Sequence, residues 1–408
     1  MSKATTPQQS ADFPVLSDDM FDPAVLADSI GSFRKIRDMG DVVWSPSLGM
    51  FIAGRFADVQ KGLRAHEVLI SGRGVTVNAA LRTDPDQTDP VGVLTMDGEE
   101  HARHKRLLMK PLTPKALRDV SDRIRVEAEA VVASVANAQQ FEAISSLASH
   151  LPKRIVSQLV GLTDVGSEQL LRWAAAAFDG FGPPDNPRLL SAVDTLGEFL
   201  AYVPDLTRDL LVPDGWAARL FDAADRSEIT EDMARSMIFD YATPALDTTI
   251  LSIGELLYQL ATTPGAFDAL QSDPGLITSA VYEAVRLASP IRGFVRYAVQ
   301  DFTFTTSTIP AGSRIWLLNA SANRDERHYD DPDQFDINRN PRDQLGWGIG
   351  SHMCAGMHLA RLEIETILSS LLDHASRIEL AGQPERMVNN GVQGWRKLPI
   401  TVYPKKLD

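Results

Sequence analysis

The sequence is short of cysteine: its 408 residues contain a single one, Cys354. A lone thiol cannot form an intramolecular disulfide, and by itself it cannot supply a structural zinc site or an iron–sulfur cluster. Together with a polar N-terminal segment that has no signal-peptide core, it leads us to expect a reducing, cytoplasmic location. Cys354 is therefore either a buried structural residue or a ligand that acts alone.

The chain also lacks any run of about 18 apolar residues, which predicts that no segment spans a membrane. Basic residues are outnumbered, 40 against 54 acidic ones, and the net charge of −14 argues against a general nucleic-acid binder. The remaining composition, 44% hydrophobic and 23% charged, is that of an ordinary globular protein long enough to bury a large core. Composition alone leaves the function open.

The surroundings of Cys354 are distinctive. Gly348 and Gly350 precede it, Gly356 follows it, and residues 357–368 form the pattern of an amphipathic helix. Glycines let a backbone approach a flat object closely, and a helix that starts after the sulfur favours the thiolate. One thiolate without further soft ligands suggests a metal that carries four ligands of its own, which is haem. The alternative is a structural cysteine in a loop.

Residues 347–361 read Trp-Gly-Ile-Gly-Ser-His-Met-Cys-Ala-Gly-Met-His-Leu-Ala-Arg. This stretch resembles the Phe-Gly-x-Gly-x-His-x-Cys-x-Gly-x-x-Leu-Ala-Arg signature of the cytochrome P450 superfamily, with Trp347 in place of the usual Phe. The resemblance implies a mainly α fold with a small β portion, in which haem b lies between a long central helix and the Cys loop. It makes Cys354 the axial iron ligand and places Gly348 and Gly356 at the cofactor.

The pattern of apolar residues and turn residues predicts the elements along the chain. We expect a flexible tail over residues 1–20 and a single haem-thiolate monooxygenase domain over 21–408. A helix should begin at Asp97, and a long loop should cover 71–93. Strands are expected at 41–46 and 49–54 and within 294–318 and 378–407. The other expected helices are 24–39, 55–66, 113–136, 143–161, 166–179, 186–203, 205–211, 230–262, 264–273 and 277–288.

Glu283 and Arg286 lie three residues apart on one helix face, where their side chains can pair. Alone this is a weak signal, typical of a surface ion pair. About 70 residues before Cys354, and followed by Ser-Pro, it resembles the superfamily's Glu-x-x-Arg motif. The resemblance implies a buried structural pair that a later loop completes, with Arg339 as a candidate third member.

Asp247 and Thr248 form an acid–alcohol pair in the expected helix 230–262. A polar turn on a solvated helix is the alternative, but the flanking residues are apolar, so we expect the pair to face an interior. An acid beside an alcohol can relay protons, and the resemblance assigns that role to both residues. Pro244 and Ala245 stand where the family usually has small residues, and the proline predicts a kink.

A basic stretch begins at His101. A solvated helix face would explain it, but the resemblance places His101 and Lys105 on a haem propionate, with Arg296 and His352 as further propionate contacts. Further basic residues could form a patch that steers an acidic ferredoxin to the protein. These residues are Arg103, Arg106 and Lys110.

Helical periodicity places Asp240, Thr243 and Pro244 on the same face as Thr248. In the family these positions, together with Phe178, Phe181 and Phe294, correspond to substrate walls, although the aromatics could equally be ordinary core. The chain looks similar to soluble bacterial members that oxidise or O-demethylate small aromatics. An ionised Asp240 would repel a benzoate, which favours a neutral methoxyaromatic or a phenol. Arg73 and Arg292 can still bind an anion, so a carboxylate substrate stays open.

These residues predict a haem-thiolate monooxygenase that uses O2 and two electrons, delivered from NAD(P)H by a reductase and a ferredoxin. The substrate could instead be another small apolar molecule, such as a terpenoid or a fatty acid. A peroxide-driven haem enzyme is a second alternative, against which the Asp247–Thr248 pair argues. A non-catalytic haem sensor and a haem-free helical scaffold are alternatives from other classes, which haem absorbance and turnover would distinguish.

Overall fold

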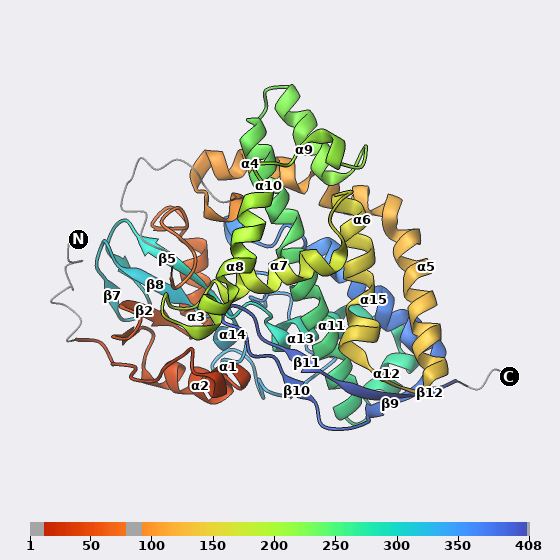
Figure 1. The fold of residues 1–408 in the computed structure, drawn as a ribbon. Coiled ribbons are helices and arrows are strands. Elements are labelled where there is room, and N and C mark those ends of the chain that lie inside the picture. Colours follow the sequence, from red (N-terminus) through yellow and green to blue (C-terminus); the bar gives the residue numbers. More distant parts are fainter. Residues whose placement is uncertain (1–11, 79–91, 406–408) are drawn as a thin grey trace.

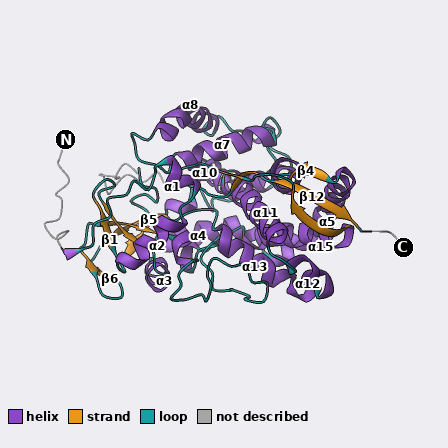
Figure 2. Ribbon diagram, turned by 90° about the horizontal axis from the view of Figure 1, so that it is seen from below, coloured by secondary structure: helices purple, strands orange, loops and turns teal. Residues whose placement is uncertain are grey.

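The computed structural model describes residues 12–78 and 92–405. Helices make up most of this part of the chain, as Figure 2 shows. They are α1 (Pro23–Ala27), α2 (Ile30–Met39), α3 (Phe56–Arg64), α4 (Gly98–Met109), α5 (Pro114–Ala138), α6 (Ser157–Val160), α7 (Ser167–Asp179), α8 (Pro187–Tyr202), α9 (Trp216–Asp225), α10 (Glu231–Ala242), α11 (Pro244–Thr262), α12 (Ala266–Ser272), α13 (Ile277–Ala288), α14 (Asn319–Ala322) and α15 (Met357–His374). No helix in this part has both the length and the apolar character needed to cross a membrane.

The strands form one larger sheet and three small ones, so the predicted mainly α fold with a small β portion is confirmed. The larger sheet has the order β1-β2-β8-β5-β3 and lies on the N-terminal side of the molecule (Figure 1). The strands are β1 (Val43–Ser45), β2 (Met50–Ala53), β3 (Leu69–Ile70), β4 (Gln140–Glu142), β5 (Phe294–Ala298), β6 (Phe302–Thr303), β7 (Thr308–Ile309), β8 (Arg314–Leu317), β9 (Ala375–Leu380), β10 (Glu385–Arg386), β11 (Trp395–Lys397) and β12 (Pro399–Pro404).

Local sequence explains where several helices begin. Thr113 and Asn186 accept hydrogen bonds from the first turns of α5 and α8, and in both helices a proline stands at the first position. Thr230 caps α10 in the same way. Asp97 precedes α4 as expected, but its carboxylate does not cap that helix. It accepts hydrogen bonds from Ser71 N and Gly72 N, at 2.9 and 2.6 Å.

The core is built around α11, whose residues from Leu246 to Leu260 are mostly buried. This helix packs against α10, α13 and α15, and α15 packs in turn against α5. The largest cluster of buried apolar side chains joins these helices with α9 and the C-terminal strands. A rigid bundle therefore holds α11 and the start of α15 in fixed relation.

The N-terminal segment is more ordered than expected. Residues 1–11 of the expected tail lie outside the described part, but Leu16 and Met20 are almost completely buried. Leu16 N donates to Trp44 O at 2.8 Å, beside a parallel bridge between Val15 and Trp44. For residues 12–20 the expectation of a flexible tail is wrong, because their apolar side chains pack beside the sheet.

Several expected helices differ in the structure. The segment 230–262 is two helices that meet at Thr243 and Pro244, where the proline provides no backbone N–H for the preceding turn. Residues 24–39 form α1 and α2, and residues 143–161 contain two π-helical turns before α6. The expected helix 205–211 is a single 3-10 turn. The helix α9 was not predicted at all.

Glu283 and Arg286 form a fully buried bidentate ion pair on α13, with both N–O distances at 2.7 Å. Arg339 Nε donates to the same carboxylate at 3.1 Å, so it occupies the third position. Arg286 also donates to the carbonyls of Asn323 and Pro332, at 2.6 and 2.7 Å. The pair thus holds the chain that leads from α14 to the Cys loop.

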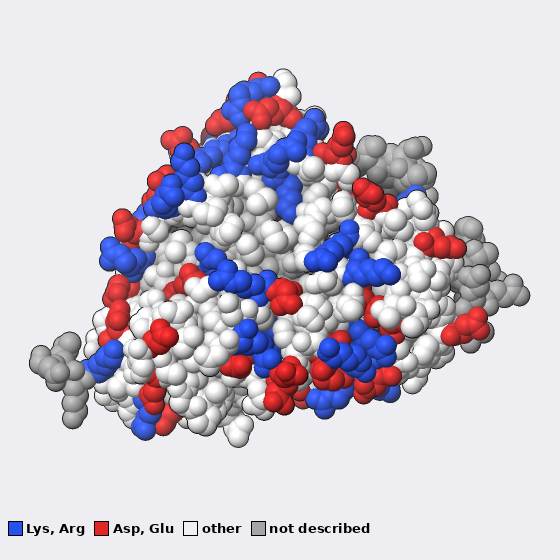
Figure 3. All heavy atoms as spheres, turned by 180° about the vertical axis from the view of Figure 1, so that it is seen from behind, with Lys and Arg blue, Asp and Glu red and all other residues white. Residues whose placement is uncertain are grey.

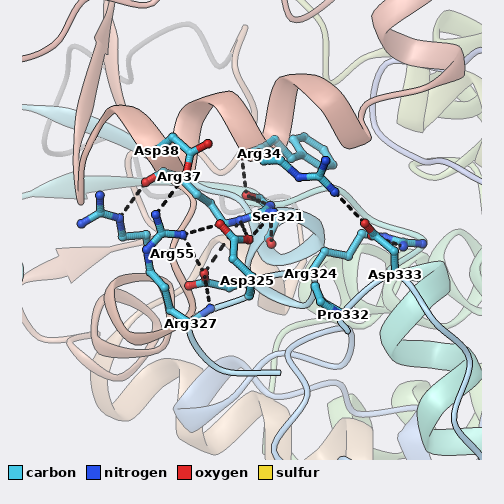
Figure 4. Close-up of polar contacts among 12 residues, drawn as sticks. Arg34, Arg37, Asp38, Arg55, Ser321, Arg324, Asp325, Arg327, Pro332 and Asp333 are labelled. Atoms are coloured by element: carbon cyan, nitrogen blue, oxygen red, sulfur yellow. Dashed lines mark hydrogen bonds and ion pairs between the residues drawn. The ribbon is translucent and has the colours of Figure 1, made fainter. Parts of the chain in front are cut away.

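Ion pairs fix the same chain from its other side (Figure 4). Arg34 and Arg324 both bind Asp333, each at 2.8 Å. Arg37, which is almost completely buried, donates to Ser321 O and pairs with Glu326 at 2.8 Å. These contacts tie helix α2 to residues 321–333, which come before the Cys354 loop in the chain. They restrict the movement of that segment.

Candidate active site

A cavity of about 660 Å³ lies between α11 and the Cys loop with the start of α15. Its size falls within the range of small-molecule and cofactor sites. Cys354 lines it from one side and Thr248 from the other, and its lining is mainly apolar. The described part of the chain therefore brings the predicted iron ligand and the predicted helix to one cavity.

Backbone N–H groups surround the sulfur of Cys354. The N–H groups of Gly356 and Met357, at the start of α15, point to Sγ. Burial raises the pKa of the thiol, while these donors and the Lys105 ammonium oppose that rise. Cys354 N donates to Trp347 O at 2.8 Å, which closes the loop beneath the cavity. This arrangement suits a thiolate bound to a cation.

Glycine has a definite use in this loop. Gly348 and Gly350 have φ of +66° and +76°, which other residues adopt only with strain. A Cβ at Gly356 would lie 3.9 Å from Cys354 Sγ, so its absence keeps the space beside the sulfur open. The loop can therefore approach a flat group closely.

The four predicted propionate contacts line one end of the cavity: His101, Lys105, Arg296 and His352. The His101 and His352 rings lie 4.1 Å apart, and Lys105 Nζ donates to Met353 O at 2.7 Å. Burial lowers the pKa of His101 to about 4, that of His352 to about 2 and that of Arg296 to about 10. Neither Lys105 nor Arg296 forms an ion pair with another described residue. A cation that lines a cavity without an ion-pair partner is stabilised when an anion binds there. These residues therefore fit the two carboxylates of haem b.

Thr248 lines the cavity and Asp247 does not. Thr248 Oγ1 donates to the carbonyl of Pro244 at 2.6 Å, across the bend where α11 begins. Burial raises the pKa of Asp247 to about 7. The structure thus places the hydroxyl at the cavity and the acid on the adjoining position of α11.

The predicted aromatic walls come together. Phe178, Phe181 and Phe294 all line the cavity, with ring centroids 5.5 Å apart for the first two and 6.2 Å apart for the last two. Thr243 and Pro244 line it from the bend between α10 and α11. These residues form an apolar chamber beside the position of the cofactor.

Asp240 also lines the cavity, but its carboxylate is engaged with backbone. Val93 N donates to Asp240 Oδ2 at 2.8 Å, and Leu94 N is directed to the same carboxylate. Burial raises the pKa of Asp240 to about 7, and these two donors oppose that rise.

Neither Arg73 nor Arg292 is among the described residues that line the cavity. Arg292 is almost completely buried, and its guanidinium donates to the carbonyls of Leu26 and Asn389, at 2.8 and 2.9 Å. Arg73 lies over the ring of Tyr297, 5.5 Å from its centroid. Both terminal nitrogens of Arg292 are thus used by backbone carbonyls and the residue does not line the cavity, so its binding of a substrate anion stays a prediction without support from this geometry.

The lining also contains polar residues that were not predicted, among them Thr249, Ser252 and Glu363. Ser252 follows Thr248 by one helical turn, so the periodicity used for Thr248 could have found it. Glu363 is completely buried on α15, and neither of its carboxyl oxygens has a hydrogen-bond partner. Burial raises its pKa to about 8. Glu363 lies four residues after Leu359, which also lines the cavity, so helical periodicity could have predicted that both side chains face it.

A lone cysteine with backbone N–H groups directed at its sulfur, a cationic edge and an apolar chamber are the features expected of a haem-thiolate monooxygenase. Comparison with known proteins identifies the family. Residues 275–400 match the cytochrome P450 family model. The chain is 34% identical over 403 residues to cytochrome p450 CYP199A2 of Rhodopseudomonas palustris, covering 98% of this chain and 97% of that protein. This protein therefore belongs to the cytochrome P450 family, and the predicted haem with its cysteine ligand is confirmed.

Two further relatives and two solved structures have lower sequence identity to this chain. Linalool 8-monooxygenase of Pseudomonas putida is 28% identical over 323 residues, or 77% of this chain and 79% of that protein. The beta-dihydromenaquinone-9 omega-hydroxylase of Mycobacterium tuberculosis is 28% identical over 398 residues, or 95% and 78%. Among solved structures, CYP109Q5 of Chondromyces apiculatus has a TM-score of 0.79 at 25% identity, covering 96% of this chain and 99% of that one. CYP108D1 of Novosphingobium aromaticivorans, at 22% identity, covers 95% and 97% with a TM-score of 0.78 and supports the fold alone.

Proposed function

We propose that this monooxygenase O-demethylates or hydroxylates a small, neutral, methoxylated aromatic compound. The observation that carries the proposal is the chamber that Phe178, Phe181 and Phe294 line together with Asp240. Aromatic side chains favour a flat apolar guest through offset and edge-to-face contacts. Among the described lining residues, the only Lys and Arg side chains are Lys105 and Arg296, which lie at the cofactor edge.

Charge in the chamber favours a neutral guest. A substrate carboxylate would meet the Asp240 carboxyl, which would have to stay protonated or repel it. A phenol is better suited, because an ionised carboxyl has about four acceptor sites and its two backbone donors leave room for a substrate hydroxyl.

Bound haem, with Cys354 donating electron density to iron, supplies the activation of O2 and the insertion of one oxygen atom into a substrate C–H bond. The chain's own residues orient the substrate and handle protons. Thr248 holds a proton at Oγ1, and Asp247 can exchange protons near neutral pH because burial raises its pKa to about 7. For a methoxy group the balance is one substrate, one O2, one NAD(P)H and one proton, giving a phenol, formaldehyde, water and NAD(P)+.

We further propose that a ferredoxin and an NAD(P)H-dependent ferredoxin reductase deliver the electrons. The support is charge: Arg103 and Arg106 are exposed on α4, followed by exposed Lys110, although the whole chain carries −14. Figure 3 shows Lys and Arg side chains near the top of the rear face, with Asp and Glu side chains among them. Such a basic surface would speed encounter with an acidic partner.

The decisive experiment is a titration of the ferric protein with matched methoxyphenols, methoxybenzaldehydes and methoxybenzoates. Displacement of iron-bound water shifts the Soret band, which reports binding. We expect a shift with the neutral compounds and none with the benzoates, followed by formaldehyde formation with a ferredoxin system. A strong shift with benzoates alone would contradict the proposed role of Asp240.

One relative favours a second candidate, the hydroxylation of a small terpenoid. The relative named linalool 8-monooxygenase supports it, and an apolar chamber would also accept such a molecule. Linalool, added as a further compound to the same titration, distinguishes the two candidate substrate classes. A Soret shift with linalool and none with the aromatic compounds would favour the terpenoid.

A further inference from the structure

Two side chains on one face of α10 hold a neighbouring segment by its backbone. Ser236 and Asp240 are four residues apart, which places them one above the other on the helix. Gly92 N donates to Ser236 Oγ at 2.9 Å, and Val93 N donates to Asp240 Oδ2 at 2.8 Å. Leu94 N is directed to the same carboxylate. Three consecutive N–H groups are therefore bound by α10.

These donors begin the 3-10 helix Val93–Thr95. The first N–H groups of a helix have no partner within it and usually rely on a capping side chain from the preceding residue. Here that residue is Gly92, which has no side chain. The cap is supplied instead by α10, a segment more than 140 residues further along the chain.

Gly92 allows the close approach. Its φ is +76°, and a Cβ built on it would lie 2.6 Å from Asp240 Oδ1. Any larger residue would push the carboxylate away from the N–H groups that it binds. The glycine and the carboxylate are thus sterically matched.

The segment held in this way is a wall of the cavity. Val93, Leu94 and Thr95 all line it, and so does Asp240. Their position is tied to α10, which runs directly into the bend at Thr243 and Pro244. A change in this attachment would therefore change the width of the chamber.

We propose that Asp240, assisted by Ser236, is a positioning residue that fastens the wall Val93–Thr95 to α10 and so limits the size of ligand that the cavity admits. The role does not depend on which substrate the enzyme uses. It differs from direct recognition of a substrate hydroxyl, because the groups that Asp240 binds belong to the protein.

The first test is amide hydrogen exchange in the haem-loaded enzyme, read at Gly92, Val93 and Leu94. Asp240→Ala removes the acceptor for two of the three amides, so we expect their exchange to speed up about 10-fold or more, as for amides that open locally. Asp240→Asn keeps one acceptor oxygen and should give a smaller increase. Should the alanine variant fail to bind haem, Asp240→Asn and Ser236→Ala carry the test.

Asp232→Asn is the matched control, since it makes the same chemical change on the same helix at a carboxylate that is 94% exposed. It should leave exchange at residues 92–94 unchanged. Wild-type exchange rates in both Asp240 variants would overturn the proposal.

The second test measures size selection without assuming a substrate. Imidazole and 4-phenylimidazole bind haem iron directly and shift the Soret band. We expect Asp240→Ala to change the ratio of their dissociation constants in favour of the larger ligand by about 10-fold, the scale on which a pocket discriminates by size. Asp240→Asn should restore part of the wild-type ratio. Equal weakening of both ligands would indicate general damage and contradict a positioning role, whatever the methoxyaromatic titration shows.

Discussion

Thr248 Oγ1 donates a 2.6 Å hydrogen bond to the carbonyl oxygen of Pro244, four residues earlier. The bond lies at the bend between α10 and α11, where Pro244 has no N–H to give to the preceding turn. It fixes the rotamer of a hydroxyl that lines the cavity, with its oxygen free to accept a further hydrogen bond. The proline and the threonine thus shape one site, to which we assign the proposed handling of protons.

Thr248→Ala should separate NAD(P)H consumption from product formation. Without the hydroxyl, proton delivery loses its positioned donor, and the product formed per NAD(P)H should fall about 10-fold or more. Thr262→Ala is the matched control, because Thr262 makes the same hydroxyl bond to the carbonyl four residues earlier, at 2.8 Å, on an exposed part of α11. Unchanged coupling in Thr248→Ala would exclude the relay role.

Cys354→Ala should abolish the thiolate-type spectrum of the ferrous–CO complex. Since Cys354 is the only cysteine of the chain, no second thiolate can replace it. Histidine ligation would give the spectrum of an imidazole-bound haem instead, so the position of the CO band decides the matter. Persistence of the thiolate-type band in this variant would refute the ligand assignment.

Glu283→Gln should strongly destabilise the protein and weaken haem retention. The change leaves the Arg286 guanidinium buried without its charge partner, and breaking a buried pair costs about 3–5 kcal/mol. Urea unfolding followed by the Soret band measures both effects. Glu385→Gln is the control, since Glu385 pairs with Arg396 at the surface, where an ion pair contributes about 0–1 kcal/mol. Equal effects of the two substitutions would contradict the structural role of the buried pair.

What the sequence could predict was carried by local patterns. The Cys354 loop, the Glu283–Arg286 spacing and the Thr248 face of α11 each occupy one short segment, so the resemblance of these motifs to a known family indicated their arrangement. Hydrogen-bond partners that come from distant segments of the chain leave no pattern in the local sequence. Val93 N binds Asp240 and the carbonyl of Asn389 binds Arg292, across 147 and 97 residues of chain.

Errors in the predicted elements have physical causes of the same kind. Residues 12–20 are polar enough to suggest a tail, yet Leu16 is buried by strand β1, which comes later in the chain. The helix α9 is short and buries one face with Trp216 and Leu220. Tertiary packing stabilises such a helix more than its own propensity does. The site was therefore more predictable than the supports that hold it.

Glu363 is the buried carboxyl with the least compensation among those lining the cavity. Its side chain is completely buried, both oxygens lack hydrogen-bond partners, and burial raises its pKa to about 8 from 4.5. Because the folded state binds the proton more tightly than the unfolded state, the free energy of unfolding falls as the pH rises between about 4.5 and 8. The stability that the protonated Glu363 contributes is fully present below its unfolded-state pKa of 4.5. It is lost as the pH rises through the folded-state pKa of about 8.

Glu363→Gln should therefore change little in stability at pH 4.5 and become more stable than wild type by up to a few kcal/mol at pH 8, since glutamine has no proton to lose. Urea unfolding of the haem-loaded protein across this window measures the difference. Glu142→Gln is the control: burial raises the pKa of Glu142, but hydrogen bonds from Ser145, Leu398 and Ile144 lower it more, so the net shift is downward. Its effect should stay constant above about pH 6, because the carboxylate is then ionised in both states. A pH-independent difference for Glu363→Gln would show that this carboxyl is hydrated or paired in solution.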